Sequence, residues 1–380
     1  MKPLSVMKFY MNNRKRFLSI FISIVLSTVL IYLVQVLIDS AFSTSYKVFV
    51  EPQKYYSSIT AKGRLLDEKL VDEIKSLDSV KSVFPWVFRY TNFYINIGGN
   101  EGAKIFTVKH NDMLALMSLL ELSLKEGRLP EPGTKEIAIH SLLAKNKNLK
   151  VGDMIGSNID KEEAIYGERI IVGLIEGESI VSFESLETWL KDNEVSFEYM
   201  LGMGILPKEG KEAQLNGYLD SLHLSGMDVR TFQSVSTQFL HNIENIKIML
   251  TFINILVIVI VSFSTGFMCY IYFSQRRSEF GILNAIGYSR QQIVNRAFIE
   301  ITGMNVIGFI AGILISLLAG AIIHIVSYEP RGQILQLWNP ECLMKAACVP
   351  LFVTAFSVIP VWRMLKRLDP ILIIERGQQI

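Results

Sequence analysis

The side chains that most often carry catalysis or bind metals are few in this sequence. The histidines are His110, His140, His223, His241 and His324. No two of them have the spacing of a metal-binding pair, and neither the HExxH zinc motif nor the GxSxG motif of serine hydrolases occurs. We therefore interpret each histidine as structural, and we predict no catalytic residue, no metal ligand and no cofactor-binding residue.

One segment, residues 204–212, approaches the glycine-rich loop that binds nucleotide phosphates. It reads Gly-Ile-Leu-Pro-Lys-Glu-Gly-Lys-Glu. The spacer between its glycines is one residue longer than in the GxxxxGK[ST] motif, and a proline interrupts it. Glu212 also stands where a hydroxyl would have to reach magnesium. If the protein depends on ATP, another chain must bind the nucleotide.

A short basic loop, residues 276–296, separates two long apolar runs and has the pattern of a helix. Phe280, Leu283 and Ile286 recur at near-helical spacing, with polar residues between them. Gly287 can end this helix in a left-handed conformation without a Cβ penalty. The sequence therefore predicts a short amphipathic helix that ends at this glycine.

A second helix is expected to begin at Ser289. Gln292, three positions later, completes the capping-box pattern. A short helix between two such caps, apolar on one side, is what a soluble partner could bind. The alternative is that this helix only lies in the membrane interface, and local chemistry does not choose between the two.

Two ionisable residues, Glu300 and Lys345, stand near the ends of apolar runs. An ionisable residue in a membrane segment is a functional candidate by default. Long side chains near helix ends can instead extend to the interface, and this is the interpretation that we prefer for both.

Composition indicates a membrane protein with a sizeable soluble part. Of the 380 residues 50% are hydrophobic and 19% charged, and the mean hydropathy is +0.33. The net charge of +2 is too small to indicate a nucleic-acid partner. Apolar runs of the length that crosses a bilayer predict four spans, at residues 17–39, 246–275, 297–326 and 343–362. A secretory signal peptide is the competing interpretation of the first, but the run is long and lacks a clear cleavage site.

The distribution of positive charge predicts on which side of the membrane each connecting segment lies. The amphipathic N-terminal segment 1–16, the loop 276–296 and the tail 363–380 are rich in lysine and arginine, whereas the loop 327–342 has only Arg331. Positive short loops stay in the cytoplasm, so both termini are expected inside. The region 40–245 is then extracytoplasmic.

Small residues on two spans predict close helix packing. Ser19, Ser23 and Ser27 repeat at four-residue spacing in the first span, and Gly308 and Gly312 form a GxxxG pair in the third. Such faces let helix backbones approach each other within a membrane. Pro350 and Pro360 allow a kink in the fourth span.

Residues 40–245 are expected to form an α+β domain, with two lobes as one arrangement. This region contains no cysteine, so an ordinary packed core must stabilise it. Period and turn signals predict helices at 65–77, 112–122, 141–147, 184–190 and 211–222, and strands at 79–84, 90–97, 105–108, 136–140, 169–175 and 228–232. Residues 125–133 are expected to be turn-rich.

This arrangement resembles the MacB/FtsX/LolC type of ABC-transporter permease (type VII). Residues 276–293, Arg-Arg-Ser-Glu-Phe-Gly-Ile-Leu-Asn-Ala-Ile-Gly-Tyr-Ser-Arg-Gln-Gln-Ile, are similar to the family's "RRxEFGILRAIGAxRxQI" signature. Weaker similarities lie at Leu66–Pro85, in the "GR…E(I/V)AI…(L)KVGD" pattern of residues 127–153, and in the tail at 368–371. The resemblance covers nearly the whole chain. The sequence departs from full MacB proteins, which carry the ATPase in the same chain.

The resemblance implies a membrane α-helical permease subunit and its partners. These are a separate ABC ATP-binding subunit, a second permease chain in a homo- or heterodimer, and an extracytoplasmic adaptor in some systems. The subunit would act by mechanotransmission, in which ATP-driven motion reaches the outer domain and exports or extracts a peptide, an antibiotic or a lipid-like substrate. It would be non-catalytic and reside in the cell membrane. The implied ATPase-coupling helix contains Ser278, Glu279, Phe280, Gly281, Ile282, Leu283, Ala285, Ile286 and Gly287.

A second function class remains open at this point. An FtsX-like signalling or regulatory scaffold would have the same topology, but its outer domain would control a cell-wall hydrolase or sense a peptide. A membrane enzyme is the third and least favoured class, because the sequence offers no candidate constellation of catalytic residues.

Overall fold

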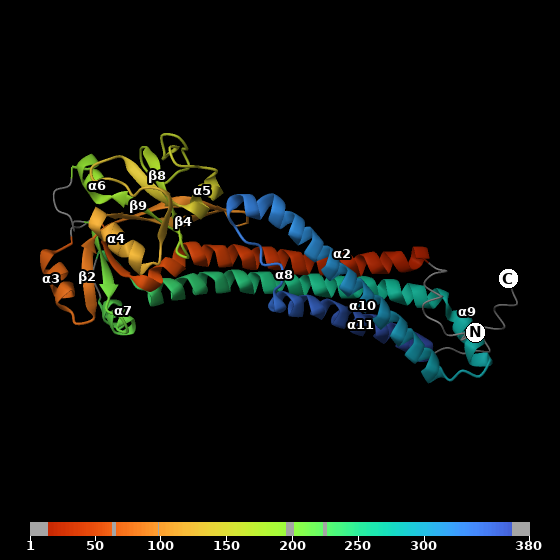
Figure 1. Ribbon diagram of the computed structural model, residues 1–380. Helices are drawn as coiled ribbons and strands as arrows, with labels where there is room; N and C mark the ends of the chain where they lie inside the picture. Colours follow the sequence, from red (N-terminus) through yellow and green to blue (C-terminus); the bar gives the residue numbers. More distant parts are fainter. Residues whose placement is uncertain (1–13, 63–65, 98, 195–200, 223–225, 367–380) are drawn as a thin grey trace. The chain divides into compact units, whose positions relative to one another are not determined.

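Four long helices hold the apolar runs of the sequence (Figure 1). The computed structural model describes residues 14–62, 66–97, 99–194, 201–222 and 226–366. Its four helices of membrane-spanning length and composition are α2 (Arg14–Ser45), α8 (Phe232–Gln275), α10 (Arg290–Ile323) and α11 (Pro340–Lys366). Most of the N-terminal segment and most of the tail predicted from the sequence lie outside the described residues.

The chain divides into two units, which we describe separately. The membrane unit contains the described residues of Met1–Leu37, Ile246–Ile323 and Gln336–Ile380. The α/β unit contains those of Ile38–Asn245 and His324–Leu335. The mixed α/β region between the first and second spans is thus a unit of its own, as the sequence predicts.

Glycines on α10 let it lie close to α2 within the membrane unit. A Cβ added to Gly308 would come within 2.9 Å of Ile24 Cγ2, and one added to Gly312 within 2.7 Å of Thr28 Cβ. One turn before Gly308, Asn305 Nδ2 donates to Thr354 Oγ1 of α11 at 2.7 Å. Small side chains and an interhelical hydrogen bond therefore join these helices, as is common where lipid surrounds the bundle.

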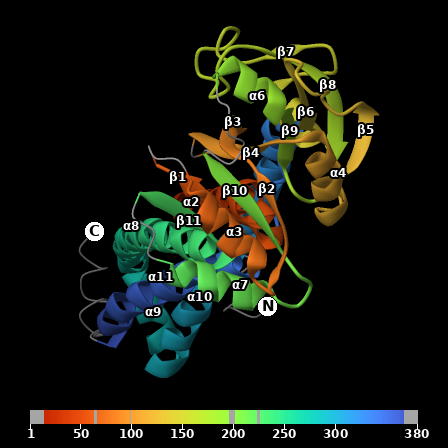
Figure 2. The same cartoon turned by 90° about the vertical axis from the view of Figure 1, so that its left-hand side faces the viewer.

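The α/β unit contains a four-stranded antiparallel sheet, which can be followed in Figure 2. Its order is β11 (Met227–Arg230), β1 (Ser57–Ala61), β10 (Gly202–Pro207) and β2 (Val80–Pro85). Helices α3 (Glu68–Ser76) and α7 (Glu212–Ser221) cover one face. Ile74 and Leu219 from these helices form a core with Met203 and Ile205, which alternate along β10 and so share that face.

A larger mixed sheet forms the rest of the α/β unit. Its path is β3 (Val87–Ile95), β4 (Gly99–Val108), β9 (Val181–Ser185), β6 (Glu136–His140), β8 (Arg169–Glu176) and β5 (Ser123–Gly127), with β7 (Met154–Ile155) paired to β8. The helices of this part are α4 (His110–Leu119), α5 (Ser141–Lys147) and α6 (Leu186–Asp192). The α/β unit thus contains two sheets, in agreement with the two-lobed arrangement that the sequence analysis considered.

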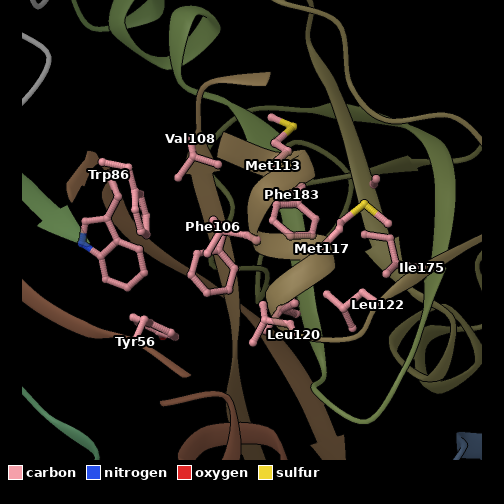
Figure 3. Close-up of a cluster of buried hydrophobic side chains, with 14 of the residues drawn as sticks. Tyr56, Trp86, Phe106, Val108, Met113, Met117, Leu120, Leu122, Ile175 and Phe183 are labelled. Carbon is pink, nitrogen blue, oxygen red and sulfur yellow. The ribbon is translucent and has the colours of Figure 1, made fainter. Parts of the chain in front are cut away.

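An aromatic core lies where the two sheets share buried side chains. Phe106 is surrounded by the rings of Tyr56, Trp86 and Phe183, at centroid distances of 5.1, 5.5 and 5.7 Å (Figure 3). These residues come from the entry segment before β1, the β2–β3 connection, β4 and β9. The core therefore connects strands that are far apart in sequence.

The segment between α10 and α11 belongs to the α/β unit. It consists of the π-helical turn η3 (His324–Tyr328), the 3₁₀ turn η4 (Glu329–Arg331) and the residues that follow. Arg331 Nη1 donates to Asn96 Oδ1 at 2.7 Å, and Gln333 Nε2 donates to the Tyr94 carbonyl at 2.6 Å. The loop between the third and fourth spans is thus bound to the β3–β4 hairpin.

Several element predictions need correction. Strands β1, β7 and β10 were not predicted, and β5 lies where only turns were expected. Residues 184–190 were expected to be helical from the start, but β9 continues to Ser185 before α6 begins. The second span was expected from residue 246, whereas α8 begins at Phe232, because its polar first turns continue the same helix.

Candidate functional site: the helix between the second and third spans

A single residue separates the second span from the short helix that follows it. Helix α8 ends at Gln275, and α9 spans Arg277–Ala285. Arg276 is the N-cap, with φ −100° and ψ 13°, which is outside helical geometry. The expected loop helix is therefore present, and it begins at a break of one residue in an otherwise continuous helical segment.

The end of α9 is a Schellman motif built on Gly287. This glycine has φ +108°, a conformation that disfavours any residue with a Cβ. The Tyr288 amide donates to the Leu283 carbonyl at 3.1 Å and the Gly287 amide to the Asn284 carbonyl at 3.0 Å. These two bonds satisfy the last carbonyls of α9 and fix the direction in which the chain leaves it.

The start of α10 is a capping box. The Ser289 amide donates to Gln292 Oε1 at 2.9 Å, and the Gln292 amide donates to Ser289 Oγ at 3.3 Å. Both bonds follow from the spacing seen in the sequence. With the preceding glycine cap, they make the turn between α9 and α10 a defined structure.

The apolar side chains of α9 do not form one continuous face. Phe280 is 1% exposed and stacks on Phe273 of α8, with 6.0 Å between ring centroids. Leu283 is partly buried against the same cluster. Ile282 and Ile286 instead point away, at 55% and 70% exposure.

This division changes which residues a partner could contact. The sequence pattern grouped Phe280, Leu283 and Ile286 on one side, but tertiary packing takes Phe280 into the membrane unit. Of the predicted coupling residues, the exposed ones are Ser278, Glu279, Ile282, Ala285, Ile286 and Gly287. Gly281, the remaining predicted member, is buried.

An ion pair beside this helix was not anticipated. Arg276 Nη1 lies 2.8 Å from Glu300 Oε1 of α10, and the glutamate is fully buried. The sequence interpretation, in which Glu300 extends to the interface, is therefore wrong, whereas Lys345 does lie partly exposed, paired with Glu341 at 2.8 Å. The available signal was that opposite charges border two consecutive spans at the same end.

The small residues predicted for helix packing have separate positions. Gly308 and Gly312 face Ile24 and Thr28 of α2 rather than the serine positions. Of the serines, Ser19 is exposed, Ser23 Oγ lies 3.5 Å from Thr265 Oγ1 of α8, and Ser27 Oγ donates to the Ser23 carbonyl at 2.6 Å. The serine row therefore lies beside the glycine contact and not within it.

His110, His140 and His324 make hydrogen bonds with backbone groups, and His241 is exposed. His140 is the N-cap of α5; its Nδ1 accepts from the Leu142 amide at 3.2 Å, and Nε2 lies 3.1 Å from the Gly177 carbonyl. Burial lowers the pKa of His140 to about 4, so the ring is neutral at pH 7. Within the described residues, no three His, Cys, Asp or Glu side chains gather as a metal site would require. His223 lies outside the described residues.

The segment that approaches a phosphate loop has another role. Gly204 lies in strand β10, where an added Cβ would come within 2.1 Å of the Phe84 ring. The glycine thus makes room for an aromatic side chain on the neighbouring strand. Lys208 and Lys211, which might have bound phosphate, both pair with Asp78.

Comparisons with known proteins concern both units. The family model "FtsX-like permease C-terminal" matches residues 251–370. The macrolide export ATP-binding/permease protein MacB of Bordetella avium (strain 197N) is 28% identical over 127 residues, which cover 33% of this chain but only 19% of that relative's length.

Two solved structures are similar to about half of the chain. The periplasmic region of MacB from Actinobacillus actinomycetemcomitans has 12% identity and a TM-score of 0.30, covering 50% of this chain and 97% of that one. The extracellular domain of the noncanonical ABC-type transporter YknZ from Gram-positive bacteria has 10% identity and a TM-score of 0.29, covering 46% of this chain and 100% of that one.

Proposed function

We propose that this chain, which is an FtsX/MacB-type permease with its FtsX-like domain at residues 251–370, is the membrane subunit of an ATP-driven ABC transporter. Permeases of this family are generally non-catalytic. ATP would be hydrolysed by a separate ABC ATP-binding subunit in the cytoplasm. The chain would pass the resulting motion to its α/β unit by mechanotransmission.

The observation that carries this proposal is the exposed pair of isoleucines on α9. Ile282 and Ile286 are one helical turn apart and so lie side by side on the helix surface. Lipid would account for them if α9 lay flat in the interface. The flanking Ser278 and Glu279 and the glycine cap at the end of α9 instead favour a polar-rimmed apolar contact, which is how a protein partner is usually bound.

Charge and packing support the proposed sidedness. The basic loop that contains α9 is expected in the cytoplasm by the positive-inside rule. The loop between the third and fourth spans, bound to the β3–β4 hairpin through Arg331 and Gln333, would then lie with the α/β unit on the extracytoplasmic side. Both termini would be cytoplasmic, and residues 40–245 would be extracytoplasmic.

The work of the complex would be export or extraction of a peptide, an antibiotic or a lipid-like molecule. This class of substrate is suggested by the family resemblance and by the MacB relative, whose name gives macrolide export as its own activity. A second permease chain, identical or different, would complete the complex, with an extracytoplasmic adaptor in some assemblies.

The test replaces Ile282 and Ile286 together by aspartate in the full chain. We expect the double variant to insert and fold but to lose co-purification with the ABC ATP-binding subunit, by about tenfold or more, because a charge would be buried without a partner at a contact of this kind. Ile159→Asp is the matched control, since Ile159 has the same 55% exposure as Ile282 but lies in the α/β unit. Equal recovery of the ATPase with both variants would contradict the proposal.

A normal efflux phenotype in cells that lack the chain, together with altered cell shape, would instead support the signalling scaffold. Labelling of single cysteines placed at Tyr90 and Ser289 tests sidedness independently. Reactivity of both positions toward the same impermeant reagent from outside would overturn the proposed topology.

A further inference from the structure

The side chain of Arg276 turns inward from the break between α8 and α9. Although it stands in a basic loop, this arginine is only 3% exposed. Its Nη1 lies 2.8 Å from Glu300 Oε1 of α10 and donates to the Tyr272 hydroxyl of α8 at 3.2 Å. Its Nε donates to Glu279 Oε2 of α9 at 3.0 Å. One guanidinium therefore contacts three helices, α8, α9 and α10.

Aromatic rings enclose the same guanidinium. Its Cζ lies 5.1 Å from the Phe280 ring centroid, 5.3 Å from that of Tyr272 and 5.7 Å from that of Phe273. Tyr272 in turn donates its hydroxyl hydrogen to Glu300 Oε1 at 3.0 Å. We call Arg276, Glu300, Tyr272 and Glu279 the Arg276 cluster.

A buried ion pair of this kind is a poor device for stability. Removing two charges from water offsets most of the attraction between them, and apolar replacements of similar size often stabilise a protein as well or better. What such a pair can add is a defined relative position of the elements that carry it. The position fixed here is that of α9 with respect to α8 and α10.

We propose that the Arg276 cluster is the positioning link that makes α9 move as one body with the second and third spans. The inference rests on the proposed function, because it assigns to α9 the displacement that ATP hydrolysis produces. Arg276 and Glu300 are positioning residues in this proposal, since neither needs to touch the ATP-binding subunit. Without the cluster, α9 would rotate about the one-residue break instead of carrying the spans with it.

Arginine is required at this position by geometry. Its planar fork presents several N–H groups at fixed angles and stacks on aromatic faces, so one side chain can bond to three helices at once. A lysine has a single ammonium on a flexible stem. Arg276→Lys therefore keeps the charge but is expected to lose the link to Glu279 or to Tyr272.

The first experiment uses the full chain in lipid nanodiscs without any partner. Hydrogen exchange of the amides in residues 277–285 is compared among Glu300→Gln, Arg276→Gln, the double variant and wild type. We expect exchange to rise about tenfold in each, which is within the range measured for residues that carry coupling between sites. The double variant leaves no unpaired buried charge, so it keeps the comparison valid if a single variant fails to fold.

Arg277→Gln is the matched control, because Arg277 is the neighbouring arginine and is exposed. Its exchange in residues 277–285 should stay at the wild-type rate. Wild-type protection in the double variant would overturn the proposal, whatever the result with an ATPase.

The second experiment measures how much ATP hydrolysis is coupled to motion. In complexes with the ABC ATP-binding subunit, we expect the double variant to co-purify normally and to hydrolyse ATP, while the ATP-dependent displacement of spin labels in the α/β unit falls about tenfold. Arg276→Lys should give an intermediate displacement. A wild-type displacement in the double variant would refute the positioning role. Failure of the wild-type chain to bind any ATPase would refute the proposed function, and the hydrogen-exchange experiment would still decide whether the Arg276 cluster positions α9.

Discussion

The two units of this chain use large and small residues in opposite ways. In the α/β unit, large aromatic side chains fill the interior, and Gly204 makes room for the ring of Phe84. In the membrane unit, Gly308 and Gly312 form the contact of α10 with α2, and large side chains such as Phe252 of α8 lie outside. Water drives apolar groups inward, whereas lipid gives them no such preference, so the helices associate through close backbone approach.

The same comparison shows how exposure must be interpreted. An exposed isoleucine on α8 is what a lipid-facing helix surface requires. The exposed pair Ile282 and Ile286 stands on a helix with polar neighbours, outside the apolar run. Surroundings along the chain, and not the exposed fraction alone, therefore indicate a candidate contact.

The largest effect is expected from a truncation in the aromatic core. Phe106→Ala removes a ring that contacts Tyr56, Trp86 and Phe183, and it should lower the free energy of unfolding of the α/β unit by about 3 to 5 kcal/mol. Figure 3 shows that its ring lies among theirs. The measurement is hydrogen exchange of β4 and β9 peptides in the detergent-solubilised chain.

Phe106→Leu is the graded control, because it leaves a smaller cavity. It should lower the free energy of unfolding of the α/β unit clearly less than the alanine variant does. If the two variants were equally stable, the aromatic core would not be the dominant source of stability in the α/β unit, and the contrast with the membrane unit would be lost.

The second effect concerns the glycine contact in the membrane unit. In Gly312→Leu the added side chain meets Thr28 and the Val25 carbonyl of α2, within 2.7 and 3.1 Å of its Cβ. We expect a loss of about 1 to 3 kcal/mol in the stability of the helix bundle, read as a lower melting temperature in detergent. Gly303→Leu on the same helix is the control, since nothing lies within 4 Å of its added Cβ. A similar loss in both variants would show that the loss does not come from the contact between α10 and α2.

Local patterns in the sequence predicted the membrane unit well. Apolar length located the four helices, and the residues 287–292 gave both caps of the α9–α10 turn, because each cap depends only on neighbours in sequence. Strand β6 and helix α5 were predicted with their observed bounds for the same reason. What the pattern could not give was the direction of Phe280, which depends on Phe273 in another helix.

Strands whose residues depend on distant partners were missed. Strand β10 has two glycines and looks like a turn, but its glycine at 204 fits beneath a ring on β2. Strand β9 contains Glu184, which favoured a helix. That carboxylate is buried between Arg89, at 2.5 Å, and Arg169, from strands β3 and β8. No local period could reveal either arrangement, nor the pairing of Arg276 with Glu300.

The smallest effect tests a buried lysine of the α/β unit, which can be compared with the buried Arg276 of the membrane unit. Lys104 of β4 is buried; its Nζ donates to Gln53 Oε1 at 2.6 Å and lies 5.3 Å from the Tyr56 ring centroid. Burial, together with the nearby charge of Arg230, lowers the pKa of Lys104 from 10.5 to about 7. Gln53 also donates to the Arg230 carbonyl at 3.1 Å, so this lysine lies where the chain leaves β11 for α8.

The sign of its pH dependence follows from proton binding. Between pH 7 and pH 10.5 the unfolded chain holds a proton on Lys104 that the folded chain has released, so stability rises with pH across that window and is flat below it. Lys104→Met removes this dependence. We expect the variant to have a higher free energy of unfolding than wild type at pH 6, and this difference to shrink by about 1 kcal/mol by pH 8. The measurement is hydrogen exchange of β4 peptides. Lys81→Met, at an exposed position of β2, should leave the wild-type profile unchanged. Parallel pH profiles for wild type and Lys104→Met would mean that this lysine stays charged. The α/β unit would then tolerate a buried cation, as the membrane unit does at Arg276 beside Glu300.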